Sequence, residues 1–125
     1  MKKKMLIVDD EEDILIFLSY HFNKNGFTVT TAPDGIIGLS KFEKDSFDII
    51  ITDIRMPYMD GIEMCSEIKK QDRITPIIFL TAVTDDYKIL HAMRTGADQF
   101  VDKPIKLDEL TAIVNGLINK IWMHS

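Results

Sequence analysis

Five short apolar runs, rich in β-branched and aromatic residues, alternate along the chain with segments whose apolar residues recur at helical spacing. Continuous apolar runs of this kind are typical of strands that are buried on both faces of a parallel sheet. Because parallel neighbours need long, right-handed crossover connections, the alternation predicts an α/β fold with a parallel sheet and helices on both faces. The strands are expected at residues 5–8, 27–31, 48–52, 77–81 and 99–101.

The segments between these strands carry apolar residues three or four positions apart, as helices that cover a sheet do. Gly26 and Gly96 follow two of these segments and fit the position that ends a helix. Cys65 is interpreted as a small core residue rather than a reactive thiol. The expected stripes are Ile14, Phe17, Leu18, His21 and Phe22; Ile36, Leu39 and Phe42; Ile62, Cys65 and Ile68; Tyr87, Leu90 and Met93; and, in a last helix from 107 to about 122, Leu107, Leu110, Val114, Leu117 and Ile121, flanked by Ile113, Ile118 and Trp122.

The composition is that of one ordinary globular domain, expected to span residues 1–125. The formal net charge is −5 and the basic residues are scattered apart from a start at residues 2–4, which argues against nucleic-acid binding. No segment is long and apolar enough for a signal peptide or a bilayer span, so no membrane association is expected. The single cysteine cannot form an internal disulfide, which favours a reducing compartment, and we expect a cytoplasmic protein.

The apolar run at residues 49–52 delivers one carboxylate, Asp53, into a loop marked by Pro57 and Gly61. Pro57 restricts the backbone, Asp60 fits the N-cap of the next helix, and Gly61 is expected to give freedom at the turn. Asp53 would lie where the strand surfaces. It is therefore the first candidate for chemistry.

Charged and hydroxyl side chains stand at the carboxyl ends of the predicted strands. In an open α/β sheet, ligands bind at these ends, near the switch point of the strand order. A flavodoxin-like 2-1-3-4-5 order would place that point between the first and third strands and would bring their carboxylates together. The residues are Asp9 and Asp10 after the first strand, Asp53 after the third, Thr81 at the end of the fourth and Lys103 just after the fifth.

Three carboxylates in close approach repel one another, so without a cation at least one should have a raised pKa. Oxygen-only ligands suit Mg²⁺, which takes one or two carboxylates together with phosphate oxygens. Aspartate is a known phosphoryl acceptor, and phosphoryl transfer needs mainly positioning and charge neutralisation. Lys103 and Thr81 offer an ammonium and a hydroxyl that suit the phosphoryl oxygens.

Five motifs are distributed over nearly the whole chain. They are Asp9-Asp10; Asp53 with Met56-Pro57-x-Met59-Asp60-Gly61; Thr81-Ala82; Gly96-Ala97-Asp98-x-Phe100; and Lys103-Pro104. In their order and spacing, these motifs together resemble the receiver domain of bacterial two-component response regulators, in particular the chemotaxis-type single-domain regulators. The resemblance implies a flavodoxin-like (βα)5 fold with a parallel sheet of order 2-1-3-4-5.

By this resemblance, Asp53 would accept a phosphoryl group from a phosphohistidine on a partner histidine kinase or histidine phosphotransfer protein. Asp10, Asp53 and the backbone carbonyl of Arg55 would bind Mg²⁺, and Asp9 would assist through water. Lys103 would pair with the phosphoryl oxygens. The peptide bond to the proline that follows it is expected to be cis, a state that only bonds before proline reach easily.

The resemblance also implies a switch. Thr81 would swing toward the phosphoryl group while Phe100, the switch aromatic of the family, turns inward. This would reshape the surface of helix four, strand five and helix five, to which a downstream output domain or protein, or a second phosphorylated copy, could bind. Arg55 and Val83 lie where the family varies and where the lifetime of the phosphorylated form is tuned.

We therefore expect a signalling switch rather than a turnover enzyme. The alternative from another class is a Mg²⁺-dependent phosphohydrolase with an aspartyl nucleophile, but such enzymes usually carry a second Asp two residues later, where this chain has Arg55. A flavin-binding carrier is disfavoured because acidic residues, rather than a phosphate-binding loop, follow the first strand. A stand-alone protein and a part of a longer regulator both fit the sequence.

Overall fold

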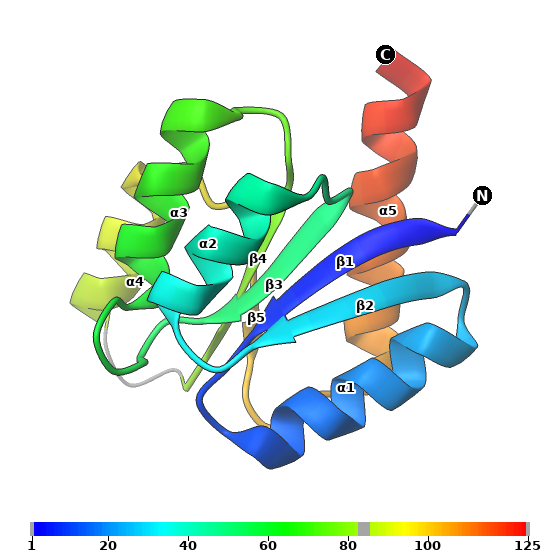
Figure 1. Cartoon of the computed structure of the whole chain (residues 1–125), viewed down its shortest axis with the longest axis horizontal. Helices are drawn as coiled ribbons and strands as arrows, with labels where there is room; N and C mark the ends of the chain where they lie inside the picture. Colours follow the sequence, from blue (N-terminus) through cyan, green and yellow to red (C-terminus); the bar gives the residue numbers. More distant parts are fainter. Residues whose placement is uncertain (1, 83–85, 125) are drawn as a thin grey trace.

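The computed structural model of the chain describes residues 2–82 and 86–124. Its five strands pair in parallel into one sheet of order β2-β1-β3-β4-β5, which confirms the predicted flavodoxin-like fold (Figure 1). The bounds of the elements differ from the expected ones by a residue or two, as the ends of elements commonly do. In chain order the elements are β1 (Lys3–Val8), α1 (Glu12–Lys24), β2 (Phe27–Ala32), α2 (Gly35–Lys44), β3 (Ile49–Asp53), α3 (Gly61–Gln71), β4 (Ile77–Thr81), α4 (Asp86–Arg94), β5 (Gln99–Asp102) and α5 (Leu107–His124).

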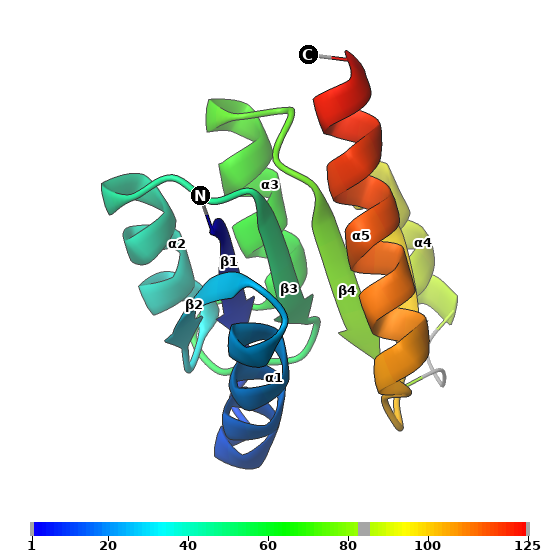
Figure 2. The same ribbon diagram turned by 90° about the vertical axis from the view of Figure 1, so that its right-hand side faces the viewer.

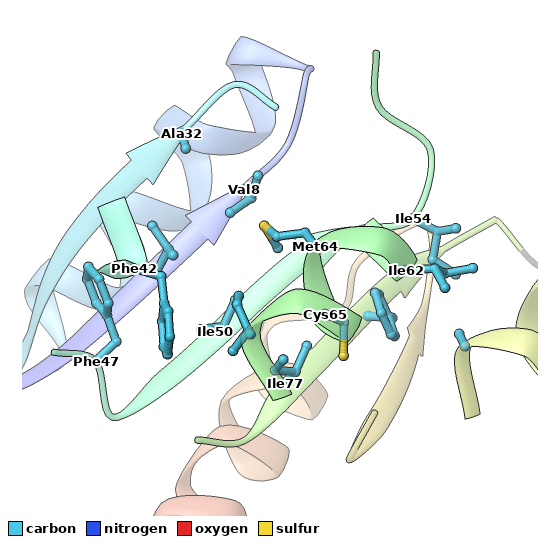
Figure 3. Packing of buried hydrophobic residues seen from close by; sticks show 14 residues of the cluster. Val8, Ala32, Phe42, Phe47, Ile50, Ile54, Ile62, Met64, Cys65 and Ile77 are labelled. Carbon is cyan, nitrogen blue, oxygen red and sulfur yellow. The ribbon is translucent and has the colours of Figure 1, made fainter. Parts of the chain in front are cut away.

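The sheet separates two apolar cores, because successive residues of a strand point to opposite faces. Met5 and Ile7 of β1 face the core that α1 and α5 cover, whereas Leu6 and Val8 face the core under α2, α3 and α4 (Figure 2). Cys65 of α3 is fully buried in the second core, which confirms it as a core residue (Figure 3). Burial on both faces explains why the strands read as continuous apolar runs.

The predicted helix stripes are wider than the faces that the helices bury. In α1, Leu18 and Phe22 are buried, whereas Phe17 is 47% exposed. Neighbouring residues of a helix point about 100° apart, and in α1 the face that buries Leu18 leaves Phe17 toward solvent. Ile36, Leu90 and Met93, which also lie at the predicted helical spacing, are exposed as well.

In α5 the fully buried line consists of Leu110, Val114 and Ile118, and Leu117 is only partly buried. The prediction placed Leu117 on the central stripe and Ile118 beside it, and this was wrong. Residues four apart form a continuous ridge along a helix, and that ridge is the one that packs on the sheet.

Within the described residues, no helix combines the length and apolar character needed to cross a membrane.

Two hydrogen bonds from backbone amides stabilise the loop from β3 to α3. The Gly61 amide donates a hydrogen bond to the Ile54 carbonyl at 2.8 Å, and the Asp60 carboxylate accepts one from the Glu63 amide at 2.8 Å, which confirms the predicted N-cap. Gly61 was expected to supply conformational freedom, but its φ does not lie in the left-handed region. A Cβ there would instead lie 2.1 Å from the carbonyl oxygen of Asp53, so a side chain is excluded by close approach.

Gly61→Ala is therefore expected to lower the free energy of unfolding by about 1–3 kcal/mol, the usual cost of overpacking, because the new Cβ meets backbone that cannot rotate away. Urea denaturation followed by circular dichroism measures this. Gly116→Ala in α5 is the matched control, since a Cβ there meets nothing within 4 Å. Alanine should stabilise that helix by about 0.5–1 kcal/mol. Equal stability of the two variants would contradict the explanation by close approach.

Candidate functional site

The pairing of β1 with β3 brings Asp9 and Asp53 to the same edge of the sheet. Val8 lies opposite Thr52 in the parallel ladder, so the next residue of each strand reaches the same level. Carboxylate oxygens of Asp9, Asp10 and Asp53 all lie within 4.8 Å of one another. The structure thus brings together the three carboxylates that the sequence placed at this edge.

Asp9 is the most buried of the three. Its Oδ1 accepts a hydrogen bond from the Glu11 amide at 2.9 Å, whereas its Oδ2 is buried without a hydrogen-bond partner. Burial raises the pKa of Asp9 to about 6, with a further contribution from the charge of Asp53, against the opposing effect of the Glu11 amide. A buried carboxylate oxygen without a hydrogen-bond donor favours a proton or a cation nearby, and the ammonium of Lys103 lies 3.6 Å from this Oδ2.

Lys103 supplies a positive charge to the cluster. Its Nζ lies 3.1 Å from an oxygen of Asp53, 3.4 Å from one of Glu11 and 3.6 Å from one of Asp9. Burial by itself lowers the pKa of Lys103, but the hydrogen bond to Asp53 and the three negative charges raise it more, so the net pKa lies above its ordinary value. The ammonium is therefore charged at neutral pH. The peptide bond to Pro104 is cis, as predicted.

Thr81 ends β4 at the same edge. Its side chain is largely buried and its hydroxyl donates to the Ala82 carbonyl at 3.2 Å, while its own carbonyl accepts from the Lys103 amide at 2.8 Å. Phe100 of β5 is half-buried, and its ring stacks on that of Phe79 with the ring centroids 5.8 Å apart. Both residues are thus placed next to the core under α2, α3 and α4, and their switch roles stay predictions.

Arg55 is exposed on the loop just after β3, and the part of its backbone carbonyl in metal binding stays a prediction. Val83, the second position expected to tune the lifetime of the phosphorylated form, lies outside the described residues.

Two features of the site were not predicted. Glu11 reaches Lys103 from the start of α1, and the run of acidic residues after β1 was the available signal. Tyr58 has a φ of 70° and is flanked by a hydrogen bond from the Met59 amide to the Pro57 carbonyl at 2.8 Å, as in a strained γ-turn. No residue pattern indicated that turn.

The carboxylate cluster fits a magnesium ion. Within the described residues, it offers only oxygen donors, which Mg²⁺ prefers. A divalent cation would offset the repulsion among Asp9, Asp10 and Asp53 and would compensate the buried Oδ2 of Asp9. The ammonium of Lys103 supplies one positive charge, which Asp9 and Asp53 share with Glu11.

A family model described as "Response regulator receiver domain" matches residues 5–115. The chain is 37% identical over 120 residues to the alkaline phosphatase synthesis transcriptional regulatory protein PhoP of Bacillus subtilis, and 37% identical over 117 residues to the response regulator SaeR of Staphylococcus aureus. These alignments cover 96% and 94% of this chain but 50% and 51% of the two relatives. The chain thus spans about half the length of the curated relatives it matches.

Solved structures show the same likeness. A response regulator receiver domain protein from Clostridium thermocellum superposes with a TM-score of 0.91 at 32% identity, covering 98% of this chain and 99% of the other. The chemotaxis protein CheY4 of Vibrio cholerae superposes with a TM-score of 0.88 at 33% identity, covering 94% and 99%. Because both superpositions cover nearly the whole chain, the likeness extends over the sheet and both helical layers.

Proposed function

Because this chain belongs to the family of response regulator receiver domains, we propose that it works as a phospho-accepting switch in which Asp53 receives the phosphoryl group. The observation that supports this most directly is the ammonium of Lys103, 3.1 Å from an oxygen of Asp53 inside a cluster of three carboxylates. Asp53 is the last residue of a buried strand, so its position is fixed. A fixed nucleophile beside a cation is what phosphoryl transfer requires.

In the proposed reaction, one carboxylate oxygen of Asp53 attacks the phosphorus of a phosphohistidine on a partner histidine kinase or phosphotransfer protein. A P–O bond forms as the P–N bond breaks, and the imidazole nitrogen leaves with the bonding pair and takes up a proton from water. Lys103 can move its ammonium from Asp53 to a phosphoryl oxygen. The hydroxyl of Thr81 can turn from its neighbouring carbonyl and donate to another.

Asp10, Asp53 and the backbone carbonyl of Arg55 are the proposed ligands of Mg²⁺, with Asp9 acting through water. When bound, the ion would neutralise the carboxylates and the charge on the phosphoryl oxygens. The burial of Asp9 and the exposure of Asp10 support different roles for the two residues. The carboxylate of Asp9 accepts a hydrogen bond from the Glu11 amide, whereas Asp10 is exposed to solvent.

We propose that Thr81 and Phe100 transmit the effect of phosphorylation to the surface of the protein. Movement of Thr81 toward the phosphoryl group would let Phe100 turn from its present stack on Phe79, and this would reshape the surface of α4, β5 and α5. Leu90 and Met93 of α4 are exposed there and offer apolar contacts to an output partner or to a second copy. Sedimentation of the phosphorylated protein would separate these cases, because only the second produces a dimer.

Incubation with Mg²⁺ and acetyl phosphate should add one phosphoryl group, because a small donor needs only the positioned carboxylate and its cations. Intact mass spectrometry measures the adduct, and hydroxylamine should remove it because an aspartyl phosphate is an acyl phosphate. EDTA should suppress the adduct at least about tenfold, because the metal neutralises charge on the transferred group. A protein that gains no adduct under these conditions would contradict the proposal.

Sustained turnover of small phosphate esters would instead support the phosphohydrolase alternative. The relatives reported above are regulators by name and lend that alternative no support. We also propose a cytoplasmic location. The single cysteine, Cys65, is free and buried, and burial raises the pKa of its thiol. A chain without a disulfide fits a reducing compartment.

A further inference from the structure

A cleft of about 570 Å³ is lined by residues from the carboxyl-terminal ends of α3 and α4. These two helices cover the same face of the sheet (Figure 1). The cleft is at the opposite edge of the sheet from Asp53, beside the backbone hydrogen bond from the Asp98 amide to the Ile77 carbonyl at the start of β4. Four basic side chains line the cleft, against one carboxylate, Asp98. Three of them lie at or just after the end of α3, and the fourth is the last residue of α4. They are Lys69, Lys70, Arg73 and Arg94.

The two lysines already have partners. The ammonium of Lys69 lies 2.8 Å from the Thr75 carbonyl, 3.3 Å from the Arg73 carbonyl and 3.4 Å from the Asp98 carboxylate. These contacts occupy all three of its donors. Lys70 pairs with Glu67 at 3.0 Å, a pair of exposed side chains on one helix face. Neither lysine is therefore the main source of unbalanced charge.

Arg73 and Arg94 differ from the lysines. Both side chains are exposed at the cleft, and in the described part of the chain neither guanidinium pairs with a carboxylate. A protein with a net charge of −5 thus directs two uncompensated positive charges into one cleft. A guanidinium presents parallel N–H donors that match two oxygens of one phosphate group.

Helix polarity opposes an anion at this place, because α3 and α4 both end here. Each helix carboxyl terminus carries about half a negative charge, so two termini amount to roughly one. The last backbone hydrogen bonds of these helices run from the amides of Asp72 and Thr95 to the carbonyls of Ile68 and Ala92, at 2.8 and 3.1 Å. Two full guanidinium charges exceed the negative charge of the two helix ends, so the cleft favours an anion.

We propose that this cleft binds a small molecule that carries a diphosphate group, with Arg73 and Arg94 each holding one phosphate. Two separate guanidinium groups match a ligand with two linked phosphates better than a ligand with a single phosphate. The volume lies in the range of about 300–1,000 Å³ that is usual for small-molecule sites. Gly96 has no side chain at the rim, and the stem of Lys69 packs there, 3.5–3.7 Å from the position that a Cβ would take. The site is independent of Asp53 and of the proposed phosphorylation.

Calorimetric titration of the full chain with inorganic pyrophosphate and with adenosine diphosphate tests the proposal. Low salt and EDTA keep the acidic site free of metal, so that its carboxylates repel these anions. One saturable site is expected. Arg73→Gln and Arg94→Gln should each weaken binding about tenfold, the usual scale for one charge-assisted contact. Lys44→Gln, which removes an exposed charge on α2, should change the affinity less than about twofold, since surface charges outside a site contribute little.

The two probes identify the source of the diphosphate, since tighter binding of adenosine diphosphate supports a nucleotide and equal binding supports a free diphosphate. Amide shifts in ¹H–¹⁵N spectra should concentrate at Thr95 and Gly96. The Asp53→Asn protein should bind both probes as the wild type does. The proposal is overturned if titration does not saturate, if the arginine variants bind unchanged, or if the shifts concentrate at Asp9 and Asp53.

Discussion

Replacing Asp53 with asparagine is expected to abolish the hydroxylamine-labile adduct that acetyl phosphate forms in the presence of Mg²⁺. The amide oxygen carries no negative charge, so it is a far weaker nucleophile and a weaker magnesium ligand than the carboxylate. Lys103 keeps its contacts with Glu11 and Asp9, so its position should be preserved. Intact mass after a fixed incubation, followed by peptide mapping, measures the loss.

Asp60→Asn is the matched control for this substitution. Asp60 lies on the same loop, but its carboxylate caps α3 by accepting from the Glu63 amide, and asparagine is an equally good N-cap. The control should label at the wild-type rate. An Asp53→Asn protein that labels like the wild type would place the nucleophile elsewhere. Loss of labelling in Asp60→Asn would show that loop geometry, rather than Asp53, limits the reaction.

The asparagine variant also reports on the electrostatics of the cluster. The charge of Asp53 contributes to the raised pKa of Asp9, so its removal should lower the pKa of Asp9 toward the ordinary range. With one of three neighbouring carboxylates neutralised, the metal-free variant should be at least as stable as the wild type. Its loss of labelling could then not be attributed to unfolding.

The sequence predicted the meeting of Asp9, Asp53 and Lys103 through the strand order 2-1-3-4-5 of a flavodoxin-like fold. Residues at the carboxyl ends of neighbouring parallel strands must reach one edge, and the alternation of strands and helices already determines which strands are parallel. The register of Val8 with Thr52 follows from burying the same apolar faces. The local pattern thus predicted the parallel strands, and the strand order of the fold brought the residues at their carboxyl ends together.

The features that escaped prediction depend on loop geometry and on helix rotation. The strained turn at Tyr58 and the close approach of Gly61 to Asp53 depend on how α3 meets the end of β3. Neither feature produces a repeating pattern of residues in the sequence. Arg73 and Arg94 share a cleft only because two helices end beside each other. Phe17 illustrates rotation, since helical spacing permits its burial but the packing of α1 does not provide it.

Asp9 should give the metal-free protein an unusual dependence of stability on pH. Its pKa is about 6 in the folded state, against an ordinary value of 3.8, so between these values the folded protein holds a proton that the unfolded chain lacks. The free energy of unfolding should therefore rise as the pH falls from about 7 to 4, by up to about 3 kcal/mol for a shift of about two units. Asp45 and Asp72 have lowered pKa values, so they change the free energy of unfolding only at pH values below this range.

Asp9→Asn should remove that dependence and stabilise the metal-free protein at pH 7 by about 1–3 kcal/mol, because a buried amide needs no proton and its oxygen can still accept from the Glu11 amide. The same change should weaken Mg²⁺ binding about 10–100-fold, as the loss of an outer partner of a metal does. Urea denaturation in EDTA at several pH values and calorimetric titration with Mg²⁺ measure the two effects. Asp34→Asn, at the buried cap of α2, is the control and should leave the Mg²⁺ affinity unchanged. Lower stability of Asp9→Asn at pH 7, or an unaltered affinity for Mg²⁺, would mean that the buried charge of Asp9 is compensated by groups of the protein itself rather than by the cation.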